Sequence, residues 1–147
     1  MKRILFALLI FFFQFSFFNS VQAQTFVGTM RVSDKTFKDV TVKLAVNDSL
    51  NTASVMIYHV LEDGVHSRKI DLLIPDILVF PSAQRTTFEC HNIVPLSEGK
   101  EWPEYHVGKL NGTTSSGVFS FSCTMGECYV TYSGVVNERA SYSRVSH

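Results

Sequence analysis

The chain has 147 residues and a formal net charge of zero at pH 7, with 13 basic and 13 acidic side chains. Phosphate binding needs clustered positive charge, and the sequence has no run of Lys or Arg, so a nucleic-acid partner is not expected. A chain of this length makes one domain that buries roughly two thirds of its unfolded surface.

The first 23 residues have the order of a secretory signal peptide. Lys2 and Arg3 are followed by an apolar run over residues 4–18 and then by small residues that end at Ala23. The run is shorter than the roughly 20 residues that span a bilayer, so an uncleaved membrane anchor is the less favoured alternative. We expect cleavage after Ala23, a mature chain that begins at Gln24 without a membrane span, and a periplasmic or extracellular location.

The first half of the mature chain alternates apolar and polar residues, which is typical of half-buried strands. Strands are predicted at 25–33, 37–46 and 53–61. Asn47 to Asn51 is a cluster of turn residues, and Glu62-Asp63-Gly64 is a hairpin signal.

The middle of the chain is less regular. A strand at 66–74 meets Pro75, which ends or bulges it because proline cannot donate to a ladder, and a short apolar continuation follows at 76–80. The next predicted strand, 86–94, leads into a looser segment at 95–103 that contains Trp102.

The last part of the chain predicts a strand at 104–110, a turn at Asn111-Gly112, strands at 118–124 and 127–136, and a polar tail at 137–147. No long segment has helical periodicity with capping signals. Roughly eight consecutive, hairpin-linked strands predict an all-β single domain, either a sandwich or, as we favour, an eight-stranded antiparallel up-and-down barrel of the lipocalin-like kind over residues 24–136.

The stretch FSFSCTMGECYVTYSG, residues 119–134, places two cysteines symmetrically about Met125-Gly126. If these two residues form the turn, Cys123 faces Cys128 at a separation that suits a disulfide, which an oxidising compartment would preserve. Two alternatives remain open: free buried thiols, or a bridge from Cys90 to one of the pair. A methionine at the first turn position would need positive φ, so a turn with Gly126 alone at positive φ would shift this register.

Several short motifs resemble the calycin-like (lipocalin-like) domain family of small secreted bacterial proteins. They are Phe26-Val27-Gly28-Thr29-Met30-Arg31-Val32 near the start of the mature chain, and Gly108-Lys109-Leu110-Asn111-Gly112, Phe119-Ser120-Phe121-Ser122, Met125-Gly126 and Val130-Thr131-Tyr132-Ser133-Gly134 near its end. The resemblance implies a signal peptide and an eight-stranded meandering barrel. The family's molecular role is largely undefined, so the resemblance supplies no catalytic residues, and the two hairpin cysteines are not part of its pattern.

Residues with catalytic or metal-binding chemistry show no characteristic spacing. The histidines and cysteines form no His-x-His or Cys-x-x-Cys pair, and Cys90 and His91 would point to opposite faces of a strand. No Gly-x-Ser-x-Gly motif or glycine-rich phosphate loop is present. We therefore expect no metal, no cofactor and no enzymatic activity.

The apolar face of the predicted strands gives the candidate binding residues. An eight-stranded barrel is either filled by its own side chains or holds one small ligand, so these residues are core positions first and cavity lining second. Trp102 is a candidate cap for a barrel mouth, although a tryptophan that closes the end of the core is the commoner outcome. The candidate interior residues are Phe26, Met30, Val42, Leu44, Phe119, Phe121, Val130 and Tyr132, with Trp102 at the end.

Two functions from different classes fit these observations. The first is a secreted, non-enzymatic barrel that binds a small apolar ligand. The second is an interaction or inhibitor protein with a filled core, acting through its loops or edge strands. A solvent-open void of roughly 300 Å³ or more favours the first.

Overall fold

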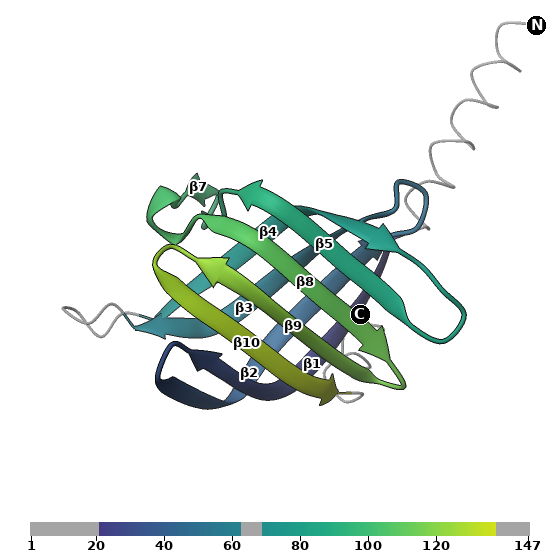
Figure 1. The fold of residues 1–147 in the computed structure, drawn as a ribbon, viewed down its shortest axis with the longest axis horizontal. Helices are drawn as coiled ribbons and strands as arrows, with labels where there is room; N and C mark the ends of the chain where they lie inside the picture. The colour runs from purple at the N-terminus through teal and green to yellow at the C-terminus, as the bar shows by residue number, and fades with distance from the viewer. Residues whose placement is uncertain (1–20, 63–68, 138–147) are drawn as a thin grey trace, which may run out of the picture.

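The computed structural model describes residues 21–62 and 69–137, and the structural statements below refer to these. Strands make up almost all of this part of the chain (Figure 1). The elements are β1 (Val21–Val32), β2 (Lys35–Asn47), β3 (Thr52–Glu62), β4 (Lys69–Phe80), β5 (Thr86–Ile93), β6 (Leu96–Ser97), β7 (Lys100–Glu101), the 3₁₀ helix η1 (Pro103–Tyr105), β8 (Val107–Ser115), β9 (Val118–Met125) and β10 (Cys128–Val136).

Eight of the strands form a closed antiparallel barrel. They follow the order β3-β2-β1-β10-β9-β8-β5-β4, and pairing of β3 with β4 closes the ring. The first and last strands meet along the β1–β10 ladder, where Gly28 lies opposite Gly134. The predicted single-domain, eight-stranded up-and-down barrel is thus confirmed. The short strands β6 and β7 extend the sheet beside β4.

Alternation along the strands produces a packed interior, because inward side chains come from every second residue. All eight predicted interior residues are buried: Phe26, Met30, Val42, Leu44, Phe119, Phe121, Val130 and Tyr132. Phe119 is the hub of an aromatic cluster: its ring centroid lies 5.4 Å from those of Phe26 and Phe121 and 5.7 Å from that of Phe88. The Tyr132 hydroxyl donates a hydrogen bond of 3.1 Å to the Val40 carbonyl oxygen.

The two ends of the barrel differ. The end that we call the mouth carries the β2–β3 turn at 48–51, the loop at 81–85 and the β8–β9 turn at 116–117, together with the start of β1 and the end of β10. The other end, the covered end, carries the segment 94–106, which includes β6, β7 and η1. There the Gly126 N–H donates to the His106 carbonyl oxygen at 2.8 Å. In Figure 1 the mouth faces right, and the covered end, marked by β7, faces left.

Two local predictions change in the structure, and a third is confirmed. Asn111 and Gly112 were expected to form a turn, but both lie inside β8, where they pair with Glu89 and Phe88. The strand predicted from Glu104 begins only at Val107, because η1 precedes it. β4 runs on past Pro75 with a bulge in which Asp76 has φ of +56°, so the bulge that Pro75 predicted is confirmed.

The ends of the predicted domain lie partly outside the described residues. Residues 1–20 of the predicted signal peptide, the tail beyond Asn137 and the predicted hairpin residues Asp63-Gly64 all fall there. The structure includes Val21 to Ala23 in β1, paired with Asn47 to Ala45. Cleavage after Ala23 would therefore shorten β1 by three residues at the mouth.

The cysteine hairpin requires a correction. The turn is Gly126-Glu127 rather than Met125-Gly126, because Gly126 takes the positive φ of +59° that methionine resists. The register therefore shifts by two residues, and Cys123 pairs with Val130 while Cys128 pairs with Met125. Diagonal neighbours lie about 7–8 Å apart, beyond the usual Cα separation in a disulfide. The predicted Cys123–Cys128 disulfide is wrong: all three cysteines are free, with Cys90 and Cys123 buried and Cys128 exposed.

This arrangement predicts that one thiol of the native protein reacts quickly with a thiol reagent at pH 8. Burial, reinforced by Glu89, raises the pKa of Cys90 to about 11, and burial with Cys90 as neighbour raises the pKa of Cys123 to about 12. Both of these thiols remain protonated and shielded, whereas Cys128 is exposed to the reagent. Titration should count one thiol in the native state, three in denaturant and none in native Cys128→Ser. A native count of zero that rises only after reduction would reinstate the disulfide.

Candidate ligand-binding site

The largest described hollow lies in the barrel mouth. Its volume is about 490 Å³, and the ends of β1, β2, β4, β5 and β8, with the β2–β3 turn, enclose it. The side chains and backbone that line it are Gln22, Ala23, Gln24, Leu44, Val46, Asp48, Asn51, Val79, Pro81, Thr86, Phe88 and Thr114.

The lining of the mouth cavity separates into an apolar and a polar part. Leu44, Val79 and Phe88 are buried and form the apolar part nearest the core. Exposed amide and carboxylate side chains, among them Gln24 and Asp48, lie toward solvent at the turns and strand ends. An apolar hollow with a few polar groups is the usual character of a small-molecule site.

A second hollow of about 220 Å³ adjoins the mouth cavity and shares Gln24, Thr86 and Thr114 with it. The loop at 82–85 and the turn at 116–117 form its outer wall. Arg85 lies in that loop, so the mouth region has one cationic side chain in addition to the anionic Asp48. The two hollows together could accept a molecule larger than either volume alone.

The aromatic core limits the depth of the mouth. Phe88 contributes both to the mouth cavity and, with its ring 5.7 Å from that of Phe119, to the aromatic cluster. Of the eight predicted interior residues, Leu44 lines the mouth cavity and Phe26 borders the adjoining hollow. The other six are Met30, Val42, Phe119, Phe121, Val130 and Tyr132, and they are buried core residues that line neither hollow.

Trp102 lies far from the mouth. It belongs to the segment at the covered end, where its ring stacks on Tyr105 with centroids 5.8 Å apart. The backbone N–H of Trp102 donates to the Pro95 carbonyl oxygen at 2.9 Å, a bond within this segment. The residue therefore belongs to the covered end and lines neither of the two mouth hollows.

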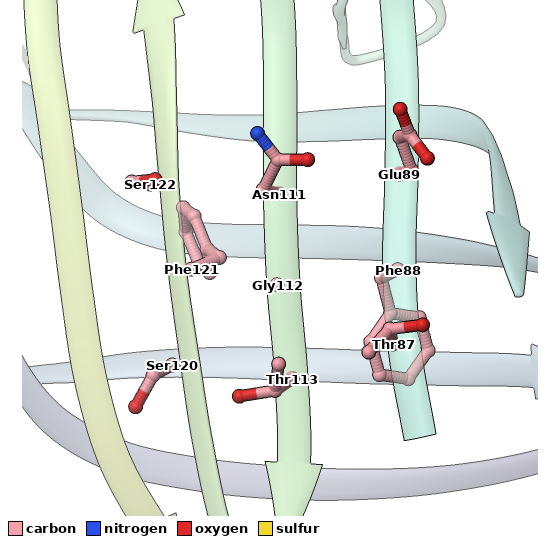
Figure 2. Close-up of a pocket in the computed structure, with 9 residues that line it drawn as sticks. All are labelled: Thr87, Phe88, Glu89, Asn111, Gly112, Thr113, Ser120, Phe121 and Ser122. Carbon is pink, nitrogen blue, oxygen red and sulfur yellow. The ribbon is translucent and has the colours of Figure 1, made fainter. Parts of the chain in front are cut away.

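A third hollow, of about 420 Å³, lies on the outer wall of the barrel, and we call it the outer groove. Figure 2 shows its lining residues on three neighbouring strands, β5, β8 and β9, with Gly112 at the centre. Thr113 pairs with both Thr87 and Ser120, and Asn111 pairs with both Glu89 and Ser122, so the groove has two transverse rows of polar side chains. Its lining comes from three strands and includes the inward-facing Phe88 and Phe121, whereas five strands enclose the mouth cavity. We therefore take the mouth as the better candidate site.

Residues that commonly carry chemistry do not gather in either place. The exposed His91 Nε2 lies 3.0 Å from Glu89 Oε1 at the edge of the outer groove. Within residues 21–62 and 69–137, no three His, Cys, Asp or Glu side chains lie where they could hold a metal ion. In the same part of the chain, no helix has the length and apolar content to cross a membrane. Burial raises the pKa of Tyr132 well above its ordinary value, which keeps its phenol a neutral donor.

Sequence reasoning missed most of the mouth residues. Phe88 and Cys90 alternate on one face of the predicted strand at 86–94, and this pattern could have placed Phe88 inside. Val79 lies beyond a bulge, which reverses the alternation that applies before Pro75. Thr86 and Thr114 carry no signal in the sequence, because threonine is neither clearly apolar nor charged and so does not indicate which face of a strand it occupies.

Comparison with known proteins supports the fold. No protein-family model and no curated protein matches the chain. A solved structure that does match is a "putative outer membrane protein" from Bacteroides fragilis NCTC 9343, with a TM-score of 0.50 at 15% sequence identity. The match covers 78% of this chain and 48% of the other, so this chain spans about half the length of that protein.

Proposed function

We propose that the protein is an exported, non-enzymatic barrel that binds a small apolar molecule in its mouth. The observation that carries this proposal is the mouth cavity of about 490 Å³, with its apolar floor and polar opening. Cleavage after Ala23 would remove Gln22 and Ala23 from one wall and leave the floor residues Leu44, Val79 and Phe88 in place. Its volume falls within the 300–1,000 Å³ that is usual for small-molecule sites.

The lining indicates the character of the ligand. Leu44, Val79 and Phe88 offer only apolar contact, so the inner part of the ligand would be hydrocarbon or an aromatic ring. Amide and hydroxyl groups surround the opening, where Asp48 and Arg85 carry opposite charges. The site therefore favours an uncharged molecule with one polar end.

Export and family are part of the same proposal. The charged, apolar and small-residue order of residues 1–23 supports secretion, with cleavage after Ala23. The similar Bacteroides protein carries a name that refers to the cell envelope, and this is compatible with export. A closed eight-stranded barrel also agrees with the resemblance to the calycin-like family.

A neutral fluorescent probe of apolar cavities, N-phenyl-1-naphthylamine, tests the proposal. We expect saturable binding by the exported protein. Val46 lines the mouth cavity, and Val46→Trp should weaken probe binding at least tenfold because the indole fills the space. Thr113→Trp places the same indole in the outer groove and should leave affinity within about twofold. Absence of probe binding, or a larger loss in Thr113→Trp than in Val46→Trp, would contradict the mouth as the site.

The alternative function, an interaction or inhibitor protein, draws support from the filled core below the mouth. Closure of the barrel pairs both sides of every long described strand, so loops and the outer groove are the surfaces left for such contacts. A pull-down that recovers a partner, and loses it when residues 95–103 are deleted, would favour this alternative. Recovery of nothing would count against it.

A further inference from the structure

Exposed apolar side chains gather around the mouth. Five of them, which we call the apolar collar, have between 37% and 66% of their surface exposed, a high fraction for large apolar residues. Tyr129, near the covered end, is exposed to a similar degree, and Val21 precedes the expected cleavage point. The apolar collar consists of Leu50, Leu78, Phe80, Val118 and Val135.

The collar lies on opposite sides of the barrel. Leu78 and Phe80 point outward from the last residues of β4, where they pair with Glu89 and Thr87 of β5. Val118 and Val135 pair with each other across β9 and β10. In the closed barrel, β4 and β10 are four strands apart in either direction, so the collar flanks the opening on both sides.

Charge has the opposite distribution along the barrel axis. Among the described residues, the loops and turns at the mouth contain only Asp48 and Arg85 as charged side chains. Glu89 is the cross-strand partner of Leu78, the collar residue of β4 that lies farther from the mouth, so the apolar surface of this wall ends there. The covered end is highly charged and exposed, with Arg31, Asp34, Lys35, Glu98, Lys100, Glu101, Glu104, Lys109 and Glu127.

We propose that the collar docks the mouth of the barrel onto the surface of a lipid bilayer with uncharged or zwitterionic headgroups. Exposed apolar side chains grouped at one end of a molecule indicate an interaction surface, and such side chains enter the boundary between headgroups and acyl chains. A bilayer interface is deformable and surrounds a rim, so it contacts both sides of the collar at once. A rigid globular partner that covers one wall leaves the opposite wall in water.

One further observation favours a membrane. β1 begins at the mouth, so the sequence that precedes it, with its apolar run at residues 4–18, connects to the barrel at this end. Within the part of the chain that the structure describes, the mouth has no cluster of basic side chains, so the docking is expected to need no anionic lipid. The inference rests on the proposed function and narrows it, because a docked mouth would exchange an apolar ligand directly with lipid.

Flotation with vesicles of phosphatidylcholine and phosphatidylethanolamine tests the docking. The exported protein should float with the vesicles, and 1 M NaCl should not release it. Leu78→Glu combined with Phe80→Glu should lower the partition coefficient at least tenfold, and Val118→Glu combined with Val135→Glu should do the same. These positions are exposed, so the variants should fold, which circular dichroism checks. The matched control is Tyr129→Glu, an exposed apolar position at the covered end, which should float like the unaltered protein.

The outcomes separate this inference from the proposed function. Val46→Trp fills the cavity and leaves the collar intact, so it should lose the probe and still float; the Leu78/Phe80 variant should bind the probe and not float. Failure of the unaltered protein to float, release by salt, or equal loss in Tyr129→Glu would overturn the docking. A dimer in solution that the collar variants dissociate would assign the collar to a second copy and also overturn it.

Discussion

Replacement of Phe119 by alanine should lower the free energy of unfolding by about 3–5 kcal/mol, the usual cost of truncating a buried phenylalanine. Phe119 is fully buried, and its ring lies within 5.7 Å, centroid to centroid, of the rings of Phe26, Phe88 and Phe121. The surrounding rings are fixed to β1, β5 and β9 itself, so the barrel wall has little freedom to collapse into the space. Urea unfolding measures the change as a lower midpoint at an unchanged slope.

Tyr129→Ala is the control for this substitution. Tyr129 is an exposed aromatic residue of β10, so its truncation should change stability by no more than about 0.5 kcal/mol. A loss below about 1 kcal/mol in Phe119→Ala would mean that the ring is not tightly packed. The barrel interior would then be open, and the reasoning that places the ligand in the mouth would fail with it.

Period-two alternation was enough to predict the barrel and its buried face. Phe119 and Phe121 are separated by a serine that points outward, and this pattern needs no knowledge of partners on other strands. A register error of two residues left the same side chains inside, which is why the faces were right although the hairpin partners were wrong. The predicted disulfide was wrong because it required Cys123 and Cys128 to be cross-strand partners. Which residues are partners depends on whether methionine or glycine is the first residue of the turn.

The mouth could not be predicted in the same way. Its lining comes from five strands and a turn that are far apart in the sequence. The bulge after Pro75 turns Val79 inward and Leu78 outward, so one irregularity sets both the floor of the cavity and part of the apolar collar. Alternation describes regular strands, and the functional features of this barrel arise where the strands are irregular.

Replacement of Gly28 by alanine should cost about 3 kcal/mol, a large part of the stability of a small domain. A Cβ atom at this position would overlap the carbonyl oxygen of Ser133 and the Cα of Gly134. Both atoms belong to the backbone of β10, which has no rotamer to change, so β1 and β10 must separate. Because β1 and β10 are the first and last strands, their separation opens the seam that closes the barrel.

Gly108→Ala is the matched control for Gly28→Ala, since Gly108 also lies inside a strand. Its added Cβ would meet the Thr124 hydroxyl oxygen at 2.7 Å, and a side-chain hydroxyl moves more easily than a backbone carbonyl. We expect a cost below about 1 kcal/mol there, within the ordinary range for a substitution.

Hydrogen exchange should show directly whether the β1–β10 seam opens. In Gly28→Ala the amides of β1 and β10 should exchange faster than those of β3 and β4, whereas in Gly108→Ala the relative exchange rates of these four strands should be the same as in the unaltered protein. Equal stability of the two variants would show that the strands are not in close backbone contact at Gly28 and Gly134. Because β1 also forms one wall of the mouth, an opened seam should weaken probe binding in Gly28→Ala even where the chain remains folded.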